Sequence, residues 1–300
     1  MKHRVFAIVM CGVMAAAGGL LAGCSRSSER TVDGIVYSPD TNRDGREEYA
    51  IWRVEEGVRV VRPLDELDGR PVTTIWLAGN EEIEEIYFPK HVTFVRDMTI
   101  DHCTNLRKVD LNDGLLSIES LAFTGLPNLH ELSIPSSVRQ IMQNAFYNDP
   151  EGADGHAACT LAINYEGTLE EMMGIEFALG GHFGVGTSFT LQGEPLTDAE
   201  LPESVKAIPA YAFSSMRDLQ TVTIGESLTA IGTQAFYHCT ALTEITYGGS
   251  KEEWLAIEKG DDWNTYYDSE SGDTAVLPLT VYCSDGAIAY GEHAEDEAAV

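Results

Sequence analysis

Residues 122–146 read AFTGLPNLHELSIPSSVRQIMQNAF, and residues 212–236 read AFSSMRDLQTVTIGESLTAIGTQAF. Each stretch begins and ends with an Ala-Phe pair, so the pair recurs after 23 residues. If the first Phe is counted as zero, apolar residues fall in both stretches at offsets +3, +6, +9, +11, +15 and +18. In the first stretch these are Leu126, Leu129, Leu132, Ile134, Val138 and Ile141. Self-similarity at a fixed period indicates a repeat architecture.

The same spacing continues on both sides of these stretches. The copy headed by Ile100 also has apolar residues at all six offsets, and partial copies are headed by Phe236, Leu77 and Thr190. Offsets +9 and +11 differ by two, which puts both side chains on one face of a short strand. A single coil of this length cannot bury its apolar face alone, so the coils must stack on a shared core. We therefore predict a repeat solenoid of about 23 residues per coil, mostly short β-strands with short helical segments.

The pattern A-F-x-x-C-x-x-L-x-x-I-x-I-P-x-S-V-x-x-I closely resembles the BspA-like, or Treponema-type, leucine-rich repeats. The resemblance covers roughly residues 70–286, with the best matches at residues 122–146 and 212–247. Residues 75–80 lack the Ala-Phe pair, and the copy at Thr190 has no Phe. The resemblance implies a leucine-rich-repeat fold. It also implies attachment to a bacterial surface and binding to proteins of a host or a neighbouring cell.

A second duplication marks the end of each repeat block. Residues 163–172 match residues 245–254, and both copies contain a capping box, Thr168-x-x-Glu171 and Ser250-x-x-Glu253. The hydroxyl and the carboxylate of such a box bond the free amides at a helix start. We therefore expect closing helices over 168–176 and 250–258, each followed by a further strand at 188–192 and 279–283. In relatives, a segment like Cys283 to Gly286 closes the array.

The pattern divides the chain into six parts. These are a signal peptide (1–23), a tether (24–32), an N-terminal β cap (33–76), a first repeat block with an inserted loop at 148–155 (77–191), a second repeat block (192–286) and an acidic tail (287–300).

The N-terminus has the features of an export signal. Lys2, His3 and Arg4 precede an uncharged apolar run that ends in Leu-Ala-Gly-Cys24. This ending resembles the lipobox of bacterial lipoproteins, in which the Cys is lipidated. The alternatives are an ordinary secretory signal or a membrane span, for which the run is short. We predict that Cys24 carries lipid and that the protein lies in the bacterial cell envelope, on the outer surface or the periplasmic face.

The charge balance excludes one class of partner. Asp and Glu number 48 against 19 Lys and Arg, a net charge of −29. Nucleic-acid binding is excluded because phosphate backbones require a basic surface.

The cysteines beyond the leader predict neither a zinc site nor a required disulfide. Cys103, Cys159, Cys239 and Cys283 have no paired spacing, so we expect no zinc site. An exported chain could pair some of them. Cys103 and Cys239 share one repeat position, however, which favours small buried side chains over a required disulfide. The sequence contains no nucleophile, metalloprotease or phosphate-loop motif, and we assign no catalytic residues and no enzyme activity.

Two segments carry candidate ligand chemistry. Asp40, Asn42, Asp44 and Glu48 have the spacing of a calcium loop, although Ile51 stands where an EF-hand needs its last ligand. The alternative is a polar hairpin tip, which Asp-Gly alone explains. The second segment is an acidic stretch from 258 to 273 that holds Trp263, Tyr266 and Tyr267. These aromatics could stack on a sugar or could pin a long loop to the body.

The outward positions +8 and +10 of each strand form two rows on the predicted sheet surface. Solenoids use such aligned rows for binding, and the alternative is a solvated polar face. The candidate binding residues are Glu85, Tyr87, Lys108, Asp110, Glu131, Ser133, Asn164, Asp198, Glu200, Thr223, Glu244 and Thr246. We expect an exported, lipid-anchored binding protein with a protein or glycan ligand. The alternatives are a glycan-binding accessory lipoprotein and a periplasmic scaffold.

Overall fold

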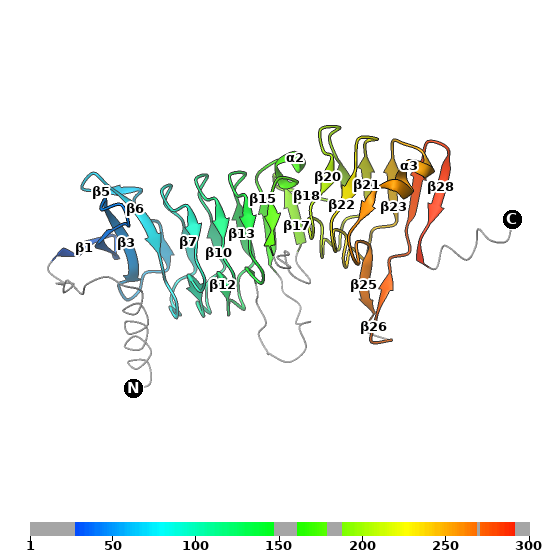
Figure 1. Ribbon diagram of the computed structural model, residues 1–300. Helices are drawn as coiled ribbons and strands as arrows, with labels where there is room; N and C mark the ends of the chain where they lie inside the picture. Colours follow the sequence, from blue (N-terminus) through cyan, green and yellow to red (C-terminus); the bar gives the residue numbers. More distant parts are fainter. Residues whose placement is uncertain (1–27, 147–160, 179–187, 269–270, 292–300) are drawn as a thin grey trace.

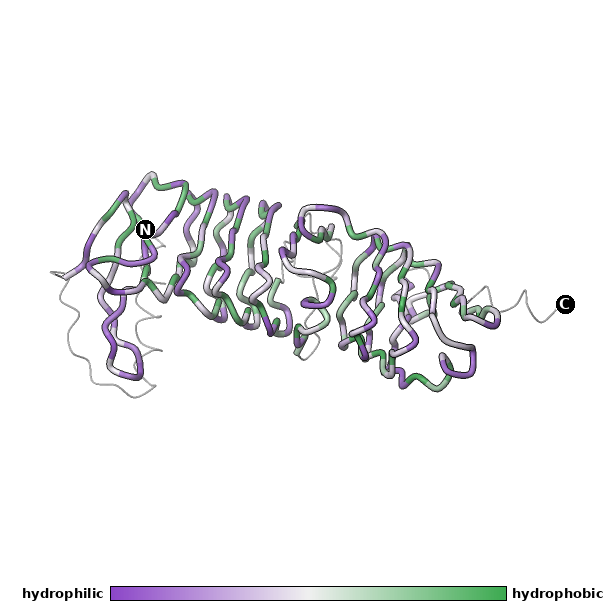
Figure 2. The backbone as a smooth tube through the Cα atoms, turned by 90° about the horizontal axis from the view of Figure 1, so that it is seen from above, coloured by the Kyte–Doolittle hydropathy of each residue, from purple (hydrophilic) through white to green (hydrophobic). Residues whose placement is uncertain are grey.

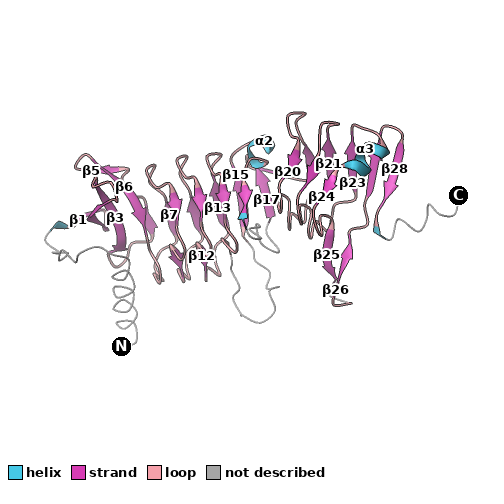
Figure 3. Ribbon diagram, viewed as in Figure 1, coloured by secondary structure: helices cyan, strands magenta, loops and turns pink. Residues whose placement is uncertain are grey.

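The computed structural model describes residues 28–146, 161–178, 188–268 and 271–291. The chain is an elongated solenoid whose coils follow one another from the N-terminal to the C-terminal end (Figure 1). Strands dominate its regular structure, and the helices α2 (Leu169–Met172) and α3 (Lys251–Ala256) are short (Figure 3). Along each coil hydrophobic and hydrophilic residues alternate (Figure 2). This architecture confirms the predicted solenoid.

The N-terminal end of the solenoid is covered by a five-stranded sheet in the order β1-β2-β3-β6-β5. Its strands are β1 (Arg30–Val32), β2 (Ile35–Thr41), β3 (Glu47–Val54), β5 (Glu66–Leu67) and β6 (Arg70–Ile75). Tyr37, Tyr49 and Ile51 on one face of this sheet are buried in the common core. The cap begins earlier than expected, because β1 uses residues 30–32, which the sequence interpretation gave to the tether.

The first repeat array is built on a seven-stranded sheet in the order β18-β17-β15-β13-β10-β7-β4. The strands are β4 (Val60–Val61), β7 (Glu85–Tyr87), β10 (Lys108–Asp110), β13 (Glu131–Ile134), β15 (Ala162–Tyr165), β17 (Ser188–Leu191) and β18 (Glu194–Pro195). All pairs are parallel except β17 with β18, which form a hairpin. Val109 lies in register with Ile86 and Leu132, as the 23-residue period requires. Thr190, which the spacing places at the head of a coil, instead lies in β17 beside Asn164.

Two shorter ladders complete the first array. One joins β8 (Phe94–Val95), β11 (Ser117–Ile118), β14 (Gln140–Ile141) and β16 (Glu176–Phe177), and the other joins β9 (Ile100–Asp101) and β12 (Phe123–Thr124). The inserted loop predicted at 148–155 lies outside the described residues.

The second array has its own five-stranded sheet in the order β19-β21-β23-β27-β28. Its strands are β19 (Asp198–Glu200), β21 (Thr221–Ile224), β23 (Glu244–Tyr247), β27 (Thr280–Cys283) and β28 (Gly286–Ala289). A ladder of β20 (Ala207–Ile208), β22 (Ala230–Ile231) and β24 (Glu258–Lys259) runs beside it. The hairpin of β25 (Thr265–Asp268) and β26 (Asp273–Val276) projects from the stack (Figure 1). Residues 287–289 belong to β28, so the expectation of a tail starting at 287 is wrong there.

The sheet is interrupted between the arrays, but the core is not. Among the described strands, β18 and β19 do not pair with each other. One cluster of buried apolar side chains nevertheless extends from Ile35 to Val281. The apolar offsets read from the sequence supply this cluster, and the Phe positions stack within it. The rings of Phe123 and Phe146 lie 5.9 Å apart, and those of Phe213 and Phe236 lie 5.2 Å apart. The prediction that these four side chains are buried is confirmed.

Both closing helices start with the predicted capping box. In α2, Thr168 Oγ1 accepts a hydrogen bond from Glu171 N, and the Glu171 carboxylate accepts one from Thr168 N. Ser250 and Glu253 repeat these contacts in α3. The helices end sooner than expected, at Met172 and Ala256, because the chain must return to the ladders through β16 and β24.

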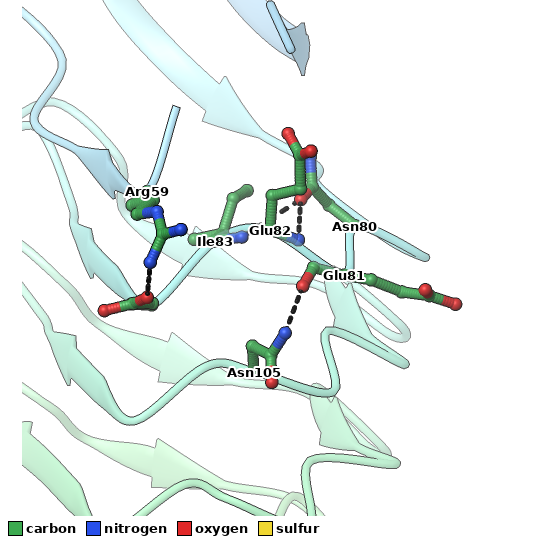
Figure 4. Close-up of polar contacts among 7 residues, drawn as sticks. Arg59, Asn80, Glu81, Glu82, Ile83 and Asn105 are labelled. Carbon is green, nitrogen blue, oxygen red and sulfur yellow. Dashed lines mark hydrogen bonds and ion pairs between the residues drawn. The ribbon is translucent and has the colours of Figure 1, made fainter. Parts of the chain in front are cut away.

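Side chains also connect successive coils. Asn105 Nδ2 donates to the Glu81 carbonyl at 2.6 Å (Figure 4). One coil later, Asn128 Nδ2 donates to the Thr104 carbonyl at 2.7 Å. Asn80 makes a local contact instead, because its Oδ1 accepts hydrogen bonds from the amides of Glu82 and Ile83 in the same turn (Figure 4). These bonds satisfy backbone groups that the irregular turns would otherwise leave unpaired.

The buried thiols behave as core side chains. Cys103 Sγ donates to the Leu77 carbonyl and Cys239 Sγ to the Phe213 carbonyl, and both residues are fully buried. Burial raises the pKa of Cys103 to about 11 and raises the pKa of Cys239 further. Cys283 is a partly exposed free thiol, and Cys159 lies outside the described residues. The repeat position shared by Cys103 and Cys239 is therefore a packing position.

Candidate binding surface

The outward rows of the first array are in register across its sheet. The +8 row runs Glu85, Lys108, Glu131, Ala162 and Ser188, and the +10 row runs Tyr87, Asp110, Ser133, Asn164 and Thr190. Their inward neighbours Ile86, Val109 and Leu132 are buried, which fixes the outward direction of both rows. We call this surface the first-array face.

Charges on the first-array face are largely paired. The Arg62 guanidinium lies 3.8 Å from the centre of the Tyr87 ring and 3.8 Å from Glu85 Oε2. The Tyr87 hydroxyl donates to Glu85 Oε2 at 2.8 Å. Lys108 Nζ lies 3.2 Å from Glu131 Oε2, and the hydrogen bond to Glu131 raises the pKa of Lys108. A ligand on this part of the face therefore meets a nearly neutral surface with one half-buried aromatic ring.

The far end of the first-array face is polar and hydrogen-bonded. Asn164 Oδ1 accepts from Thr190 Oγ1 at 2.9 Å and from Gly193 N at 2.8 Å. Beside it, burial raises the pKa of Glu166, and the nearby carboxylates of Asp110 and Asp113 raise it further. These acids give the rim of the face a negative potential.

The second array presents a face of different chemistry. Its +8 row runs Asp198, Thr221, Glu244 and Thr280, and its +10 row runs Glu200, Thr223, Thr246 and Tyr282. Asp198 accepts hydrogen bonds from Thr221 Oγ1 at 2.7 Å and Thr197 Oγ1 at 2.8 Å, and these bonds lower the pKa of its carboxyl group. We call this surface the second-array face. It carries three carboxylates, and its rows contain no Lys or Arg.

The structure adds residues that the sequence interpretation missed. Ser188, Thr190, Thr280 and Tyr282 extend the rows onto the closing strands, and extending the offsets to the predicted strands at 188–192 and 279–283 would have found them. No repeat offset predicts that Arg62 lies on this face, because Arg62 precedes the first repeat and reaches Tyr87 from the end of β4.

The candidate calcium loop is a hairpin tip in the structure. Asn42 Oδ1 accepts from the amides of Asp44 and Arg46, each at 3.0 Å, and Asp40 Oδ1 accepts from the Thr41 amide. Gly45 has a φ of +79°, the left-handed conformation that favours glycine. Asp40 and Glu48 face each other across β2 and β3. Within the described residues, no three His, Cys, Asp or Glu side chains are grouped to hold a metal ion.

The aromatic segment considered for glycan binding is mostly internal. Trp263 is 8% exposed and packs against Phe236, Trp254 and Tyr290. It continues the Phe213–Phe236 column, since the Phe236 amide bonds the Trp263 carbonyl. Tyr266 packs against the core, and only Tyr267 is substantially exposed. Of the two interpretations of this segment, the burial of Trp263 and the packing of Tyr266 favour aromatics that pin the loop to the body, and Tyr267 is the exposed ring.

The parallel ladders, the 23-residue coils and the buried leucine-type column define a leucine-rich-repeat solenoid. A family model described as the BspA type leucine rich repeat region matches in six copies, over residues 77–151 and 187–254. The chain therefore contains BspA-type leucine-rich repeats. A search of the curated proteins gave no match.

The solved structures that the comparison matched include leucine-rich proteins from three organisms. A T. pallidum leucine-rich-repeat protein is 19% identical, with a TM-score of 0.36 and coverage of 78% of this chain and 86% of that one. A leucine-rich cell surface protein from Faecalibacterium prausnitzii is 16% identical, with a TM-score of 0.27 and coverage of 79% and 99%. A leucine-rich-repeat protein from Bacteroides ovatus is 16% identical, with a TM-score of 0.32 and coverage of 84% and 78%. 

No helix in the described part of the chain has the length and apolar character to cross a bilayer.

Proposed function

We propose that this chain is an exported, lipid-anchored binding protein of the bacterial cell surface, without enzymatic activity, that engages protein ligands through its sheet faces. The observation that carries the proposal is the register of the outward rows. This register aligns polar side chains on the first-array face and on the second-array face, above a packed apolar core. Rigid presentation of side chains reduces the conformational entropy lost on binding. The lipobox-like sequence before Cys24 supports export and anchoring.

The second-array face favours a basic, extended segment of a protein partner. Asp198, Glu200 and Glu244 lie on it without a lysine or arginine in the rows. A lysine-rich segment would find carboxylates together with the hydroxyl groups of Thr223 and Thr246. Charge complementarity of this kind mainly raises the association rate and sets specificity, and salt screens it over about 10 Å at 0.1 M.

A charge-reversal pair tests the use of this face. Glu200→Lys with Glu244→Lys should abolish binding of an octalysine peptide and slow association with any matrix protein captured from a purified panel. Glu226→Lys with Glu258→Lys is the matched control, because both residues are exposed and Glu258 lies on the other ladder. Equal loss in the two variants would mean that net charge rather than the face determines binding, and no loss in either would reject the face.

Anchoring and location are tested separately. Cys24→Ser should move the protein from the membrane fraction to the soluble fraction, since the lipid would be absent. Unchanged fractionation with normal processing would contradict the anchor. Protease treatment of intact cells should remove the solenoid if it faces outward, whereas protection of the chain would favour the periplasmic scaffold.

A further inference from the structure

The sheet of the N-terminal cap has a second face that the array does not use. Ser38, Ala50 and Thr74 are cross-strand neighbours on it, because Ala50 pairs with both of the others. Trp52 and Trp76 follow two residues later on the same face, since side chains alternate along a strand. Their rings lie 6.2 Å apart at 33°, and Trp52 is 41% exposed. We call this surface the tryptophan face.

The N-terminal segment of the described chain runs along the edge of the cap sheet, where β1 pairs with β2. Glu29 Oε1 accepts a hydrogen bond from Ser38 Oγ at 3.2 Å, and Ser38 belongs to the tryptophan face. Glu29 Oε2 accepts from Arg53 Nη2 at 2.8 Å. The bond with Ser38 places the Glu29 side chain on the side of the sheet that carries the tryptophan face.

The distance to the anchor is short. Cys24 precedes Glu29 by five residues. A fully extended chain spans at most about 3.6 Å per residue, so the anchor lies within about 18 Å of Glu29. This step rests on the proposed lipidation of Cys24. With so short a connection, part of the cap must lie close to the headgroups, and the bond between Glu29 and Ser38 favours the tryptophan face.

We propose that the tryptophan face lies against the bilayer that holds the lipid of Cys24, with Trp52 and Trp76 at headgroup level. Indole rings combine an apolar body with an N–H donor, and for this reason tryptophan concentrates at membrane–water interfaces. Ala50 is 0% exposed, so the accessible apolar surface of this face comes from the two indole rings, of which Trp52 is the more exposed. By the same alternation, the paired residues Asp40 and Glu48 lie on this face toward the hairpin tip, together with Ser38 and Thr74, so soluble oligosaccharide is included in the test as the competing ligand.

The proposed orientation also agrees with the charge distribution. The second array lies at the opposite end of the elongated molecule from the cap (Figures 1 and 2). Contact through the cap therefore does not require the carboxylates of the second-array face to approach the headgroups. The same orientation leaves the second-array face open to partners.

The four tryptophans of the chain provide the test. Trp254 and Trp263 are buried at the far end, 0% and 8% exposed, and serve as an internal reference. The full lipidated chain is reconstituted into phosphatidylcholine vesicles with or without bromine on the upper acyl chain. Bromine quenches indoles that reach the acyl boundary. We expect emission to fall in brominated vesicles, and the fall to disappear when Trp52→Phe and Trp76→Phe are combined.

Several outcomes would overturn the proposal. These are unchanged emission in brominated vesicles, quenching that persists in the double variant, or indoles that respond to soluble oligosaccharides but not to bromine. Trp52→Phe alone, at the more exposed site, should remove part of the quenching and keeps the test open if the double variant does not fold. Failure of the anchor gives a different signature, since the wild-type chain would then not remain with washed vesicles, and Cys24→Ser would leave fractionation in cells unchanged.

Discussion

Phe213→Ala tests the register of the repeats at a single side chain. Phe213 is 0% exposed and stacks on Phe236, with ring centroids 5.2 Å apart and planes 3° apart. Truncation removes the transfer free energy of the ring and leaves a cavity that stacked coils on both sides cannot easily close. Buried Phe→Ala changes cost about 3–5 kcal/mol, and the rigid ladders on each side favour the upper half of that range.

Tryptophan emission during guanidinium unfolding provides the assay. Trp254 and Trp263 report on the second array, whereas Trp52 and Trp76 report on the N-terminal cap. Double variants that keep one pair of tryptophans separate the two signals. Phe94→Ala is the matched control, since Phe94 lies in β8 with 49% of its surface exposed, and we expect it to cost less than about 1 kcal/mol.

The outcome of this comparison is decisive for the repeat register. A loss of less than about 1 kcal/mol at Phe213, or an equal loss at Phe94, would refute the assignment of the Phe column to the core. A full loss confined to the second-array signal would show in addition that the two arrays unfold separately.

Three further predictions concern single residues. Leu121 has a φ of +54° at the coil position where Asn144 stands one repeat later, so Leu121→Asn should raise the free energy of unfolding by up to about 1 kcal/mol, measured by denaturant titration. Cys283 should react with a thiol reagent in the folded protein, whereas Cys103, whose pKa burial raises to about 11, should react only on unfolding, and fast labelling of Cys103 at pH 8 would contradict its packing role. Ser250→Ala removes the N-cap of α3 and should lower stability by about 1 kcal/mol, with Ser250→Thr as the conservative control that restores it.

The 23-residue period was sufficient to predict the core and the outward rows. The side chain at each apolar offset contacts the side chain at the same offset one coil away. Residues that touch in the core are therefore one repeat apart in the sequence, and the repeat spacing identifies them. This is why Leu132, Val222 and their equivalents could be placed inside, and Glu131 and Thr223 outside, from spacing alone. The capping boxes were readable for a related reason, because the hydrogen bonds of a helix start join residues three apart.

The features that the sequence did not reveal depend on non-repeating contacts. The N-terminal cap pairs β3 with β6 in parallel, a contact between segments about twenty residues apart for which no second copy exists. Trp263 departs from the Phe spacing, since it follows Phe236 by 27 residues, and its core role appears only once the Phe236 amide is seen bonded to it. Arg62 reaches Tyr87 from outside the repeats.

The junction of the two arrays connects stability to binding. In a solenoid the total stability is a sum of coil terms and of interfaces between neighbouring coils. At the junction no ladder joins β18 to β19 among the described strands, and the contacts that the described residues make there include the shared apolar core and a bond from Ser204 Oγ to Glu170 Oε1 at 2.7 Å. This interface should therefore contribute less than any other in the stack. The nearly neutral first-array face and the acidic second-array face thus belong to units that are coupled mainly through apolar packing, so a ligand held by carboxylates on the second unit should stabilise that unit and leave the unfolding of the first almost unchanged.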